Sequence, residues 1–190
     1  MKIAWRGVVI HSSRSGKPLT DAQEFTATVN HLSNVESGVS AHMVIGRQSG
    51  LAYPIPTSRV AYHAREPSNS THLSIELVQQ TKDVLFTPFQ YEQAARQCVL
   101  WAIEFNFPLN VDKNPIQGII GHEFLSAGML DGKSDPGPMF DWKLFERQIK
   151  ENLLHVVWTC AERFAGEEQW LSTGLKSTVA LFKETGSLQK

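Results

Sequence analysis

The 190-residue sequence is poor in cysteine, in net charge and in long hydrophobic runs, and each shortage excludes a class of protein. Its two cysteines, Cys98 and Cys160, stand in apolar, helix-like segments. This context predicts buried thiols rather than a disulfide framework or a zinc knuckle. The 18 Lys and Arg residues nearly balance the 19 Asp and Glu residues, leaving a formal net charge of -1. Nothing therefore favours nucleic acid or an anionic membrane as a partner.

No stretch reaches the roughly 20 consecutive apolar residues that a membrane-spanning helix needs, so we expect no membrane insertion. The first residues, Met-Lys-Ile-Ala-Trp-Arg-Gly, also lack the apolar run and small-residue cleavage site of a signal peptide. We therefore expect synthesis in the cytoplasm without a signal peptide, which does not settle where the protein acts. A chain of 190 residues is long enough for one domain with a real core and a small appendage.

Strand and helix signals alternate along the chain. β-forming residues predict strands at residues 3–10, 41–47, 51–55, 59–63, 73–78 and 116–120, with a hairpin joining 41–47 to 51–55. Three helix starts carry capping signals: Thr20 with Gln23 or Asp21 with Glu24, Thr87 before Pro88, and Asp141. A weaker helix is expected at residues 167–183. The pattern lacks strict βαβ regularity and predicts an α/β or α+β fold, a central mixed sheet with helices packed on it.

The stretch from residue 116 to residue 142 carries a concentration of reactive side chains. A short apolar run ends at His122, and a glycine-rich loop leads to Lys133 and Asp135. Because Pro136 keeps Asp135 extended, Lys133 and Asp135 should face the same way. This arrangement is typical of a loop that presents groups for chemistry, although a turn-rich loop with solvated side chains fits it equally well.

Three groups on separate elements are candidates for one cluster: His11 at a strand end, His122 at another, and Asp135 in the loop. Two imidazoles and a carboxylate are zinc ligands, and three protein ligands with an open fourth position are typical of catalytic zinc. The spacing is too long-range for the residues alone to prove the cluster. Capping or buried polar roles for the same side chains stay open.

Six motifs together resemble a known family. They are Val-Val-Ile-His-Ser-Ser around His11, residues 39–45, residues 60–64, residues 74–77, residues 121–123, and the block Lys-Ser-Asp-Pro-Gly-Pro-Met-Phe-Asp-Trp at 133–142. In this order they are similar to the zinc-dependent N-acetylmuramoyl-L-alanine amidases of the amidase-2 family, which includes AmpD-like enzymes and peptidoglycan recognition proteins. The similarity runs from about Gly7 to Phe145, and its last block is the most specific.

The resemblance implies a central mixed, mostly parallel sheet flanked by helices, and a role for each matching residue. His11, His122 and Asp135 are implied as ligands of Zn²⁺, Glu76 as the catalytic glutamate and Lys133 as the catalytic lysine. The implied reaction is hydrolysis of the amide bond between N-acetylmuramic acid and L-alanine of the peptidoglycan stem peptide. The alternatives are a strand-edge salt bridge for Glu76 and a solvated loop position for Lys133.

Three features depart from the family pattern. Ala41 stands where some members have a tyrosine before the histidine, so Glu76 must act alone as the base. Ser74 replaces a glycine, and residues 127–132 make the loop before Asp135 longer than usual.

Further candidates lie around the expected cleft. Tyr62 and His63 are predicted to line a sugar or peptide site, with a structural histidine as the alternative for His63. Arg14, just past His11, is predicted to meet a stem-peptide carboxylate. His42 is predicted to be a packed or ligand-orienting imidazole rather than a ligand.

The organisation expected from these features is a catalytic domain at residues 1–153 and a helical C-terminal extension at residues 154–190, packed on the domain or used for association. A peptidoglycan or muropeptide substrate and a monomer or weak homo-oligomer are expected. The short loop between Ala64 and Leu73 favours wall lysis of the endolysin or autolysin type, reaching the wall by holin-assisted export or lysis. A cytosolic muropeptide-recycling amidase and a non-catalytic peptidoglycan-binding module are the alternatives.

Overall fold

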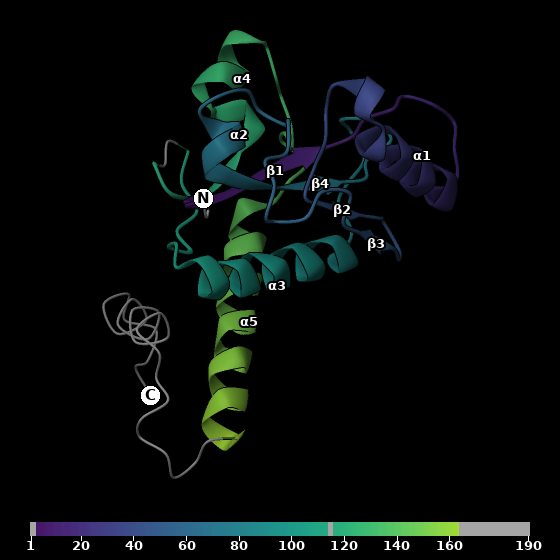
Figure 1. The fold of residues 1–190 in the computed structure, drawn as a ribbon. Helices are drawn as coiled ribbons and strands as arrows, with labels where there is room; N and C mark the ends of the chain where they lie inside the picture. The colour runs from purple at the N-terminus through teal and green to yellow at the C-terminus, as the bar shows by residue number, and fades with distance from the viewer. Residues whose placement is uncertain (1–2, 114–115, 164–190) are drawn as a thin grey trace.

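The computed structural model describes residues 3–113 and 116–163. Its elements are the strands β1 (Gly7–Ser12), β2 (Met43–Ile45), β3 (Leu51–Ala52), β4 (His72–Leu77) and β5 (Gly118–Gly121), the helices α1 (Asp21–Ser33), α2 (Ser68–Thr71), α3 (Pro88–Phe105), α4 (Ser126–Leu130) and α5 (Trp142–Arg163), and the 3-10 turns η1 (Val35–Ser37) and η2 (His122–Phe124). Figure 1 shows the helices arranged around one sheet.

The sheet has the order β3-β2-β4-β1-β5. β1 lies between β4 and β5 and is parallel to both. β2 is parallel to β4 and forms the expected antiparallel hairpin with β3. The sheet is thus mixed and mostly parallel, which confirms the fold class expected from the sequence.

The two faces of the sheet are covered differently. Alternate residues of a strand point to opposite faces, and Val8 and Ile10 join the large core beneath α3 and α5, whereas Val9 packs with Ile120 on the other face. Figure 1 shows α3 and α5 together on one side, with α1, α2 and α4 toward the two ends of the opposite side. By the same alternation His11 lies on the face of Val9. His11 therefore lies on the side of the sheet that carries α1, α2 and α4.

Local signals explain where the main helices begin. The capping boxes Thr20–Gln23 and Thr87–Gln90 are both present, at the starts of α1 and α3. The carboxylate of Asp141 accepts a hydrogen bond from Leu144 N at 3.0 Å at the start of α5. Each cap satisfies backbone N–H groups that have no partner inside the helix. All three predicted helix starts are confirmed.

The strand predicted at residues 59–63 is wrong, because this segment is an irregular loop. Its backbone groups bind side chains and other loops instead of a strand: Tyr62 N donates to Ser40 Oγ at 2.8 Å, and His63 N donates to Asn69 Oδ1 at 2.9 Å. The first strand begins at Gly7 rather than at residue 3. Apolar composition alone did not reveal which hydrogen-bonding partner each backbone group would find.

Several expectations reach the limits of the described residues. Cys98 is buried and free, as expected, while the side chain of Cys160 lies outside them. The helix predicted at residues 167–183 also lies outside. Helix α5 runs without a break across the expected domain boundary after residue 153.

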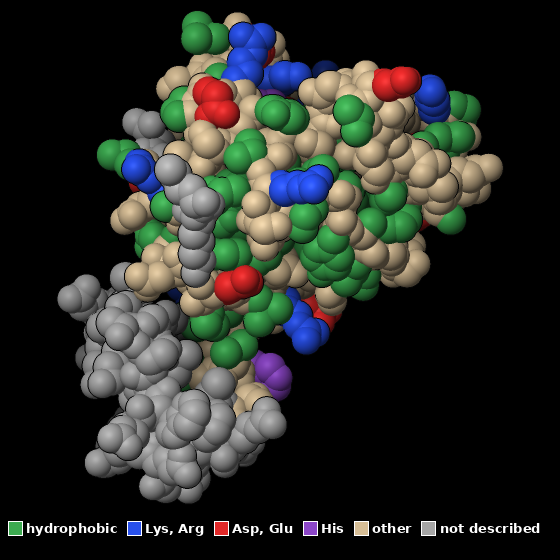
Figure 2. All heavy atoms as spheres, viewed as in Figure 1, with side chains coloured by type: hydrophobic (Ala, Val, Ile, Leu, Met, Phe, Trp, Pro, Cys, Tyr) green, Lys and Arg blue, Asp and Glu red, His purple; other side chains and the backbone are tan. Residues whose placement is uncertain are grey.

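No helix in the described ranges combines the length and the apolar character that crossing a bilayer requires. Figure 2 shows acidic and basic side chains interspersed over the described part of one face.

Candidate metal centre

Three side chains from distant parts of the sequence meet at the carboxyl ends of β1 and β5. Ile10 of β1 is in register with Gly121 of β5, so His11 and His122 follow paired residues of adjacent parallel strands. Asp135 comes from the loop after α4. One ligand atom from each of the three residues lies within 4.8 Å of the others. Clefts at the carboxyl ends of parallel strands are the usual place for a site in such sheets.

Asp135 lies between the two imidazoles. Its Oδ2 is 3.2 Å from His11 Nδ1 and 3.2 Å from His122 Nδ1. Burial works to raise the pKa of Asp135, but its close contacts with the imidazoles of His11 and His122 prevail and hold it well below its ordinary value. Burial lowers the pKa of His11, with the contact to Asp135 opposing it. An ionised carboxylate and a neutral imidazole are the forms that bind a metal ion.

His63 determines which nitrogen of His11 faces the cluster. His63 Nε2 lies 3.1 Å from the carbonyl oxygen of His72, which can only accept a hydrogen bond, so Nε2 carries the proton. Burial, followed by the proximity of His11, holds the pKa of His63 well below its ordinary value, so the ring is neutral and its Nδ1 accepts. That Nδ1 is 3.0 Å from His11 Nε2, which must donate. His11 therefore turns a lone pair on Nδ1 toward Asp135.

This assignment tests whether the three residues fit a metal ion. His11 Nδ1 and Asp135 Oδ2 both present lone pairs at a separation of 3.2 Å. Two acceptors facing each other at that distance repel unless a cation or a proton lies between them. Nitrogen and oxygen donors of this kind suit Zn²⁺, and the contact from His63 provides the orienting partner that metal-bound histidines usually have. The donor set fits a divalent metal ion.

Glu76 and Lys133 lie beside this cluster. Glu76 in β4 is in register with His11 in β1, so the two side chains share a face of the sheet. Burial, followed by the negative charge of Asp135, raises the pKa of Glu76 to about 8. Lys133 is exposed and lies two residues before Asp135 on the same loop. A carboxyl group with a raised pKa beside a metal site is typical of an acid or base in catalysis.

A cavity of about 610 Å³ brings most of the predicted site residues together. Seven of the eight line it: His11, Tyr62, His63, Glu76, His122, Lys133 and Asp135. Arg14 does not line it, and its guanidinium binds residues of the loop that carries Asp135. Seven of the predicted residues therefore line one cleft, and the eighth, Arg14, does not.

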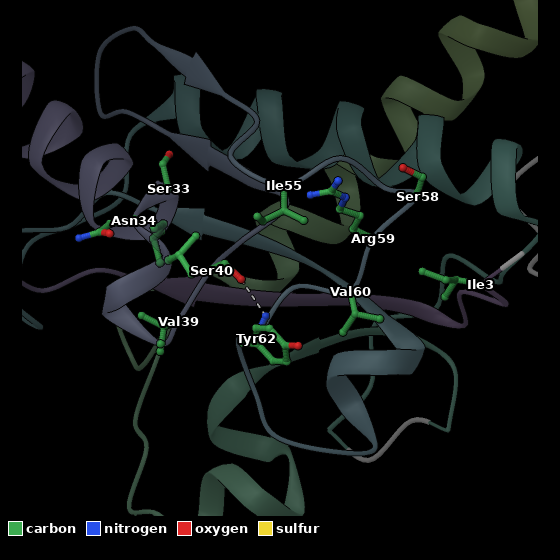
Figure 3. Close-up of a pocket in the computed structure, with 13 residues that line it drawn as sticks. Ile3, Ser33, Asn34, Val39, Ser40, Ile55, Ser58, Arg59, Val60 and Tyr62 are labelled. Carbon is green, nitrogen blue, oxygen red and sulfur yellow. Dashed lines mark hydrogen bonds between the residues drawn. The ribbon is translucent and has the colours of Figure 1, made fainter. Parts of the chain in front are cut away.

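A second cavity, of about 780 Å³, adjoins the first and shares four lining residues with it: Leu32, Val39, Ser40 and Tyr62. Figure 3 shows Tyr62 held to Ser40, with Ile55 and Arg59 on the opposite side of this cavity in the view. Tyr62 is 62% exposed. Tyr62 thus stands where the two hollows meet.

Two residues support the site from behind, His42, which the sequence predicted, and Gly128, which it did not. His42 is fully buried, and its ring is fixed by Ser74 at 3.0 Å and by the carbonyl of Arg59 at 3.1 Å, so it is the packed histidine that was expected. The serine that replaces a family glycine at position 74 therefore supports the interior and does not face the cleft. Gly128 in α4 approaches His122 so closely that an added Cβ would meet its carbonyl oxygen at 2.0 Å. In the sequence, the only sign of this close approach is that position 128 is a glycine.

Comparison with known proteins gives a consistent result. The family model described as N-acetylmuramoyl-L-alanine amidase, Amidase_2, matches residues 1–138. The 1,6-anhydro-N-acetylmuramyl-L-alanine amidase AmpD of Salmonella typhimurium strain LT2 is 33% identical over 136 residues, which cover 68% of this chain and 64% of that protein. AmpD of Escherichia coli K12 is 34% identical over 131 residues, 65% of this chain and 63% of that protein. The match thus spans less than two thirds of these relatives' length.

Solved structures show the same fold. A selenomethionine derivative of AmpD superposes with a TM-score of 0.57 at 23% identity, over 78% of this chain and 86% of that one. The amidase AmiD of E. coli, bound to the substrate anhydro-N-acetylmuramic acid-L-Ala-D-gamma-Glu-L-Lys, gives a TM-score of 0.58 at 19% identity, over 78% of this chain and 58% of that one. At these identities the likeness concerns the fold.

Proposed function

Because the chain belongs to the N-acetylmuramoyl-L-alanine amidase family, Amidase_2, we propose that it hydrolyses the amide bond between N-acetylmuramic acid and L-alanine of peptidoglycan stem peptides. The observation that carries the proposal is the convergence of His11, His122 and Asp135 within 4.8 Å, beside Glu76. A module that only binds peptidoglycan needs no such donor set with a partly buried acid next to it.

His11, His122 and Asp135 would hold a Zn²⁺ ion, with His11 and His122 offering Nδ1 and Asp135 a carboxylate oxygen. Bound there with an open position, zinc would lower the pKa of a water molecule toward about 7 and polarise the scissile carbonyl. The role of these residues is to orient the ion. His63 keeps His11 in the correct tautomer, and the low pKa of Asp135 keeps its carboxylate ionised at any pH where the enzyme would work.

Glu76 would act as general base and then as general acid. It lies on the same face as His11, within a strand whose other side chains are buried. Its raised pKa of about 8 suits a group that takes a proton from the attacking water and returns it to the L-alanine nitrogen. The transfer leaves a carboxylate on the lactyl group of the sugar and a free amine on the peptide.

Lys133 would stabilise the oxyanion that forms during attack. Lys133 lines the same cavity as Glu76 and occupies an exposed position on the Asp135 loop. A positive charge placed where negative charge develops lowers the barrier more in a partly enclosed cleft than in water. Tyr62, at the junction of the two cavities, and His63 would contact the substrate beyond the reacting bond.

Two sources of substrate are possible for this chemistry. The curated relatives bear a name for action on 1,6-anhydro-N-acetylmuramyl-L-alanine, which supports a soluble muropeptide and a recycling role in the cytoplasm. Wall lysis of the endolysin type is the second candidate, supported by the short connection from His63 to β4, which holds only the small helix α2. For the chain architecture we propose a catalytic unit at residues 1–153 and an extension from residue 154 that packs on it or mediates weak self-association.

One experiment tests the proposal. The purified protein, loaded with zinc or stripped by a chelator, is incubated separately with defined anhydromuropeptides and with intact sacculi, and the products are identified by mass spectrometry. We expect cleavage at the lactyl–alanine bond in the zinc-loaded sample and none after chelation. Binding without cleavage in both samples would refute the amidase proposal, and the faster substrate would decide between the two sources.

A further inference from the structure

The side chain of Arg14 binds the backbone on both sides of Asp135. Its Nη1 donates to Ser134 Oγ at 2.7 Å, and its Nη2 donates to the carbonyl oxygens of Ser134 at 2.7 Å and Pro136 at 2.9 Å. Ser134 and Pro136 are the two chain neighbours of Asp135. The half-buried guanidinium therefore grips the residues that flank a proposed metal ligand, and it does so without touching the ligand's carboxylate.

We propose that Arg14 is a positioning residue that fixes the Asp135 carboxylate for metal binding. The peptide oxygen of Asp135 itself accepts from Glu123 N at 2.9 Å. Three consecutive carbonyl groups, at residues 134, 135 and 136, are therefore all held, the outer two by Arg14. A loop fixed in this way holds its carboxylate in place before the ion binds. Metal binding then does not have to order the loop, so no conformational entropy is lost at that step and the affinity for the ion is higher.

Arg14 is itself held rigidly from the neighbouring strand. Its backbone N donates to the carbonyl of Gln79 at 2.7 Å, and its Nε donates to Gln79 Oε1 at 3.2 Å. Gln79 is fully buried beyond the end of β4, and its own amide donates to the carbonyl of Val84 at 2.6 Å. Through these bonds Arg14 fixes the loop that carries Asp135 relative to the end of β4. Both N–H groups of Nη2 donate to the loop, so the guanidinium has few donors left for a substrate carboxylate.

The loop is shaped to admit this guanidinium. A Cβ added at Gly137 would lie 2.5 Å from Arg14 Nη2, and the backbone there has a φ of +82°, which L side chains rarely adopt. Glycine at position 137 is therefore needed both for the turn and for the close approach of Arg14. The Asp-Pro-Gly sequence and the arginine near the first strand act as one unit.

The planar fork of arginine, rather than its charge alone, makes this arrangement. A lysine at position 14 would keep the positive charge but could not reach two carbonyl oxygens and a hydroxyl in fixed directions. A binding role for Arg14 toward substrate predicts something different, namely a raised KM with unchanged metal affinity. The two roles can be separated by measurement.

The test compares Arg14→Met and Arg14→Lys with a matched control, Arg147→Met, which removes an exposed arginine from α5. Zinc dissociation constants are measured by competition with a chromophoric chelator, and kcat and KM are measured at saturating zinc. We expect Arg14→Met to weaken zinc binding by about 10- to 100-fold, the usual loss when a partner behind a metal ligand is removed. Arg14→Lys should restore only a small part of this loss, KM should stay close to that of the unmodified protein, and the control should change nothing.

Two outcomes would overturn the proposal. One is an Arg14→Met protein with unchanged zinc affinity, whether or not KM rises. The other is full rescue by Arg14→Lys, which would assign the effect to charge. Should Arg14→Met fail to fold, Ser134→Ala removes one hydrogen bond of the set and should still weaken zinc binding measurably, while equal affinity would again contradict the proposal.

The inference rests on the proposed function only in taking Asp135 as a metal ligand, and its failure is distinguishable from that of the amidase proposal. Zinc affinity needs no turnover. A protein that binds zinc tightly and loses it on Arg14→Met, yet cleaves nothing, would end the amidase proposal alone. If the protein is an active zinc amidase but Arg14→Met leaves its zinc affinity unchanged, this inference is wrong and the amidase proposal stands.

Discussion

Glu76 provides a test of the site that needs neither metal nor substrate. Its pKa of about 8 lies far above the ordinary 4.5 because burial removes water from the carboxyl group and because Asp135 adds a nearby negative charge. The folded protein therefore holds a proton on Glu76 that the unfolded chain releases near pH 4.5. Replacing Glu76 with glutamine keeps the shape of the neutral group and removes the titration.

The direction of the effect follows from proton linkage. Between pH 4.5 and about 8 the folded state binds more protons at Glu76 than the unfolded state does, so the free energy of unfolding falls as pH rises through this window. The rise in pKa from 4.5 to about 8 corresponds to roughly 5 kcal/mol at about 1.4 kcal/mol for each pKa unit, most of which is lost by pH 8. That is a large part of the roughly 5–15 kcal/mol that stabilises an ordinary domain.

The assay is urea denaturation of the metal-free protein and of Glu76→Gln, over a series from about pH 5 to about pH 8.5. The lowered pKa values of His11 and His63 act in both proteins and cancel in the difference. We expect the variant to equal the parent near pH 5 and to exceed it by several kcal/mol near pH 8. Added zinc should shrink the difference, because a cation favours the ionised carboxylate. A difference that does not change with pH would refute the reasoning.

Four further outcomes follow from the same geometry. Glu76→Gln should retain zinc while losing about 10²- to 10⁴-fold in turnover, measured by metal analysis and product release, and a retained rate would exclude it as the base. His122→Ala should lose bound zinc and activity together, and zinc at full stoichiometry would contradict its role as a ligand. Ser74→Ala should cost about 1–3 kcal/mol in urea denaturation, because buried His42 loses a partner, and an unchanged midpoint would contradict the contact. Gly128→Ala should displace His122 and weaken zinc binding, since its Cβ would lie 2.0 Å from the carbonyl of that ligand, and unaltered affinity would show that the helix simply shifts away.

The parts of the fold that could be predicted are those that residues close together in the sequence determine. Thr20 and Thr87 lie three residues before a glutamine, and this spacing alone specifies a capping box whatever the rest of the chain does. The hairpin after Ile45 is equally local. The segment at residues 59–63 was not predictable, because its backbone partners Ser40 and Asn69 are side chains on other loops.

The candidate site divides in the same way. Lys133 and Asp135 could be assigned to one face from the proline that follows them, but nothing local joins them to His11 on the first strand. The residues alone made His11, His122 and Asp135 candidates for one cluster. The resemblance to a family assigned them to one site, and the sheet order explains why they meet. The contact of His63 with His11 and the grip of Arg14 on the loop depend on positions within a few ångströms, which no pattern of residue types encodes.

The place of β1 in the sheet has a consequence for how the protein is made. Among the described strands β1 leaves the ribosome before the others, yet one of its two neighbours, β5, leaves it after them, and Gly7 pairs with Gly118. Until that late segment emerges, a run of apolar residues from Val8 to Ile10 presents an open hydrogen-bonding edge, a state prone to aggregation and suited to chaperone binding. The proposed metal centre also needs Asp135 from the loop beyond β5, so an ion could bind there only after all the described strands of the sheet have been synthesised.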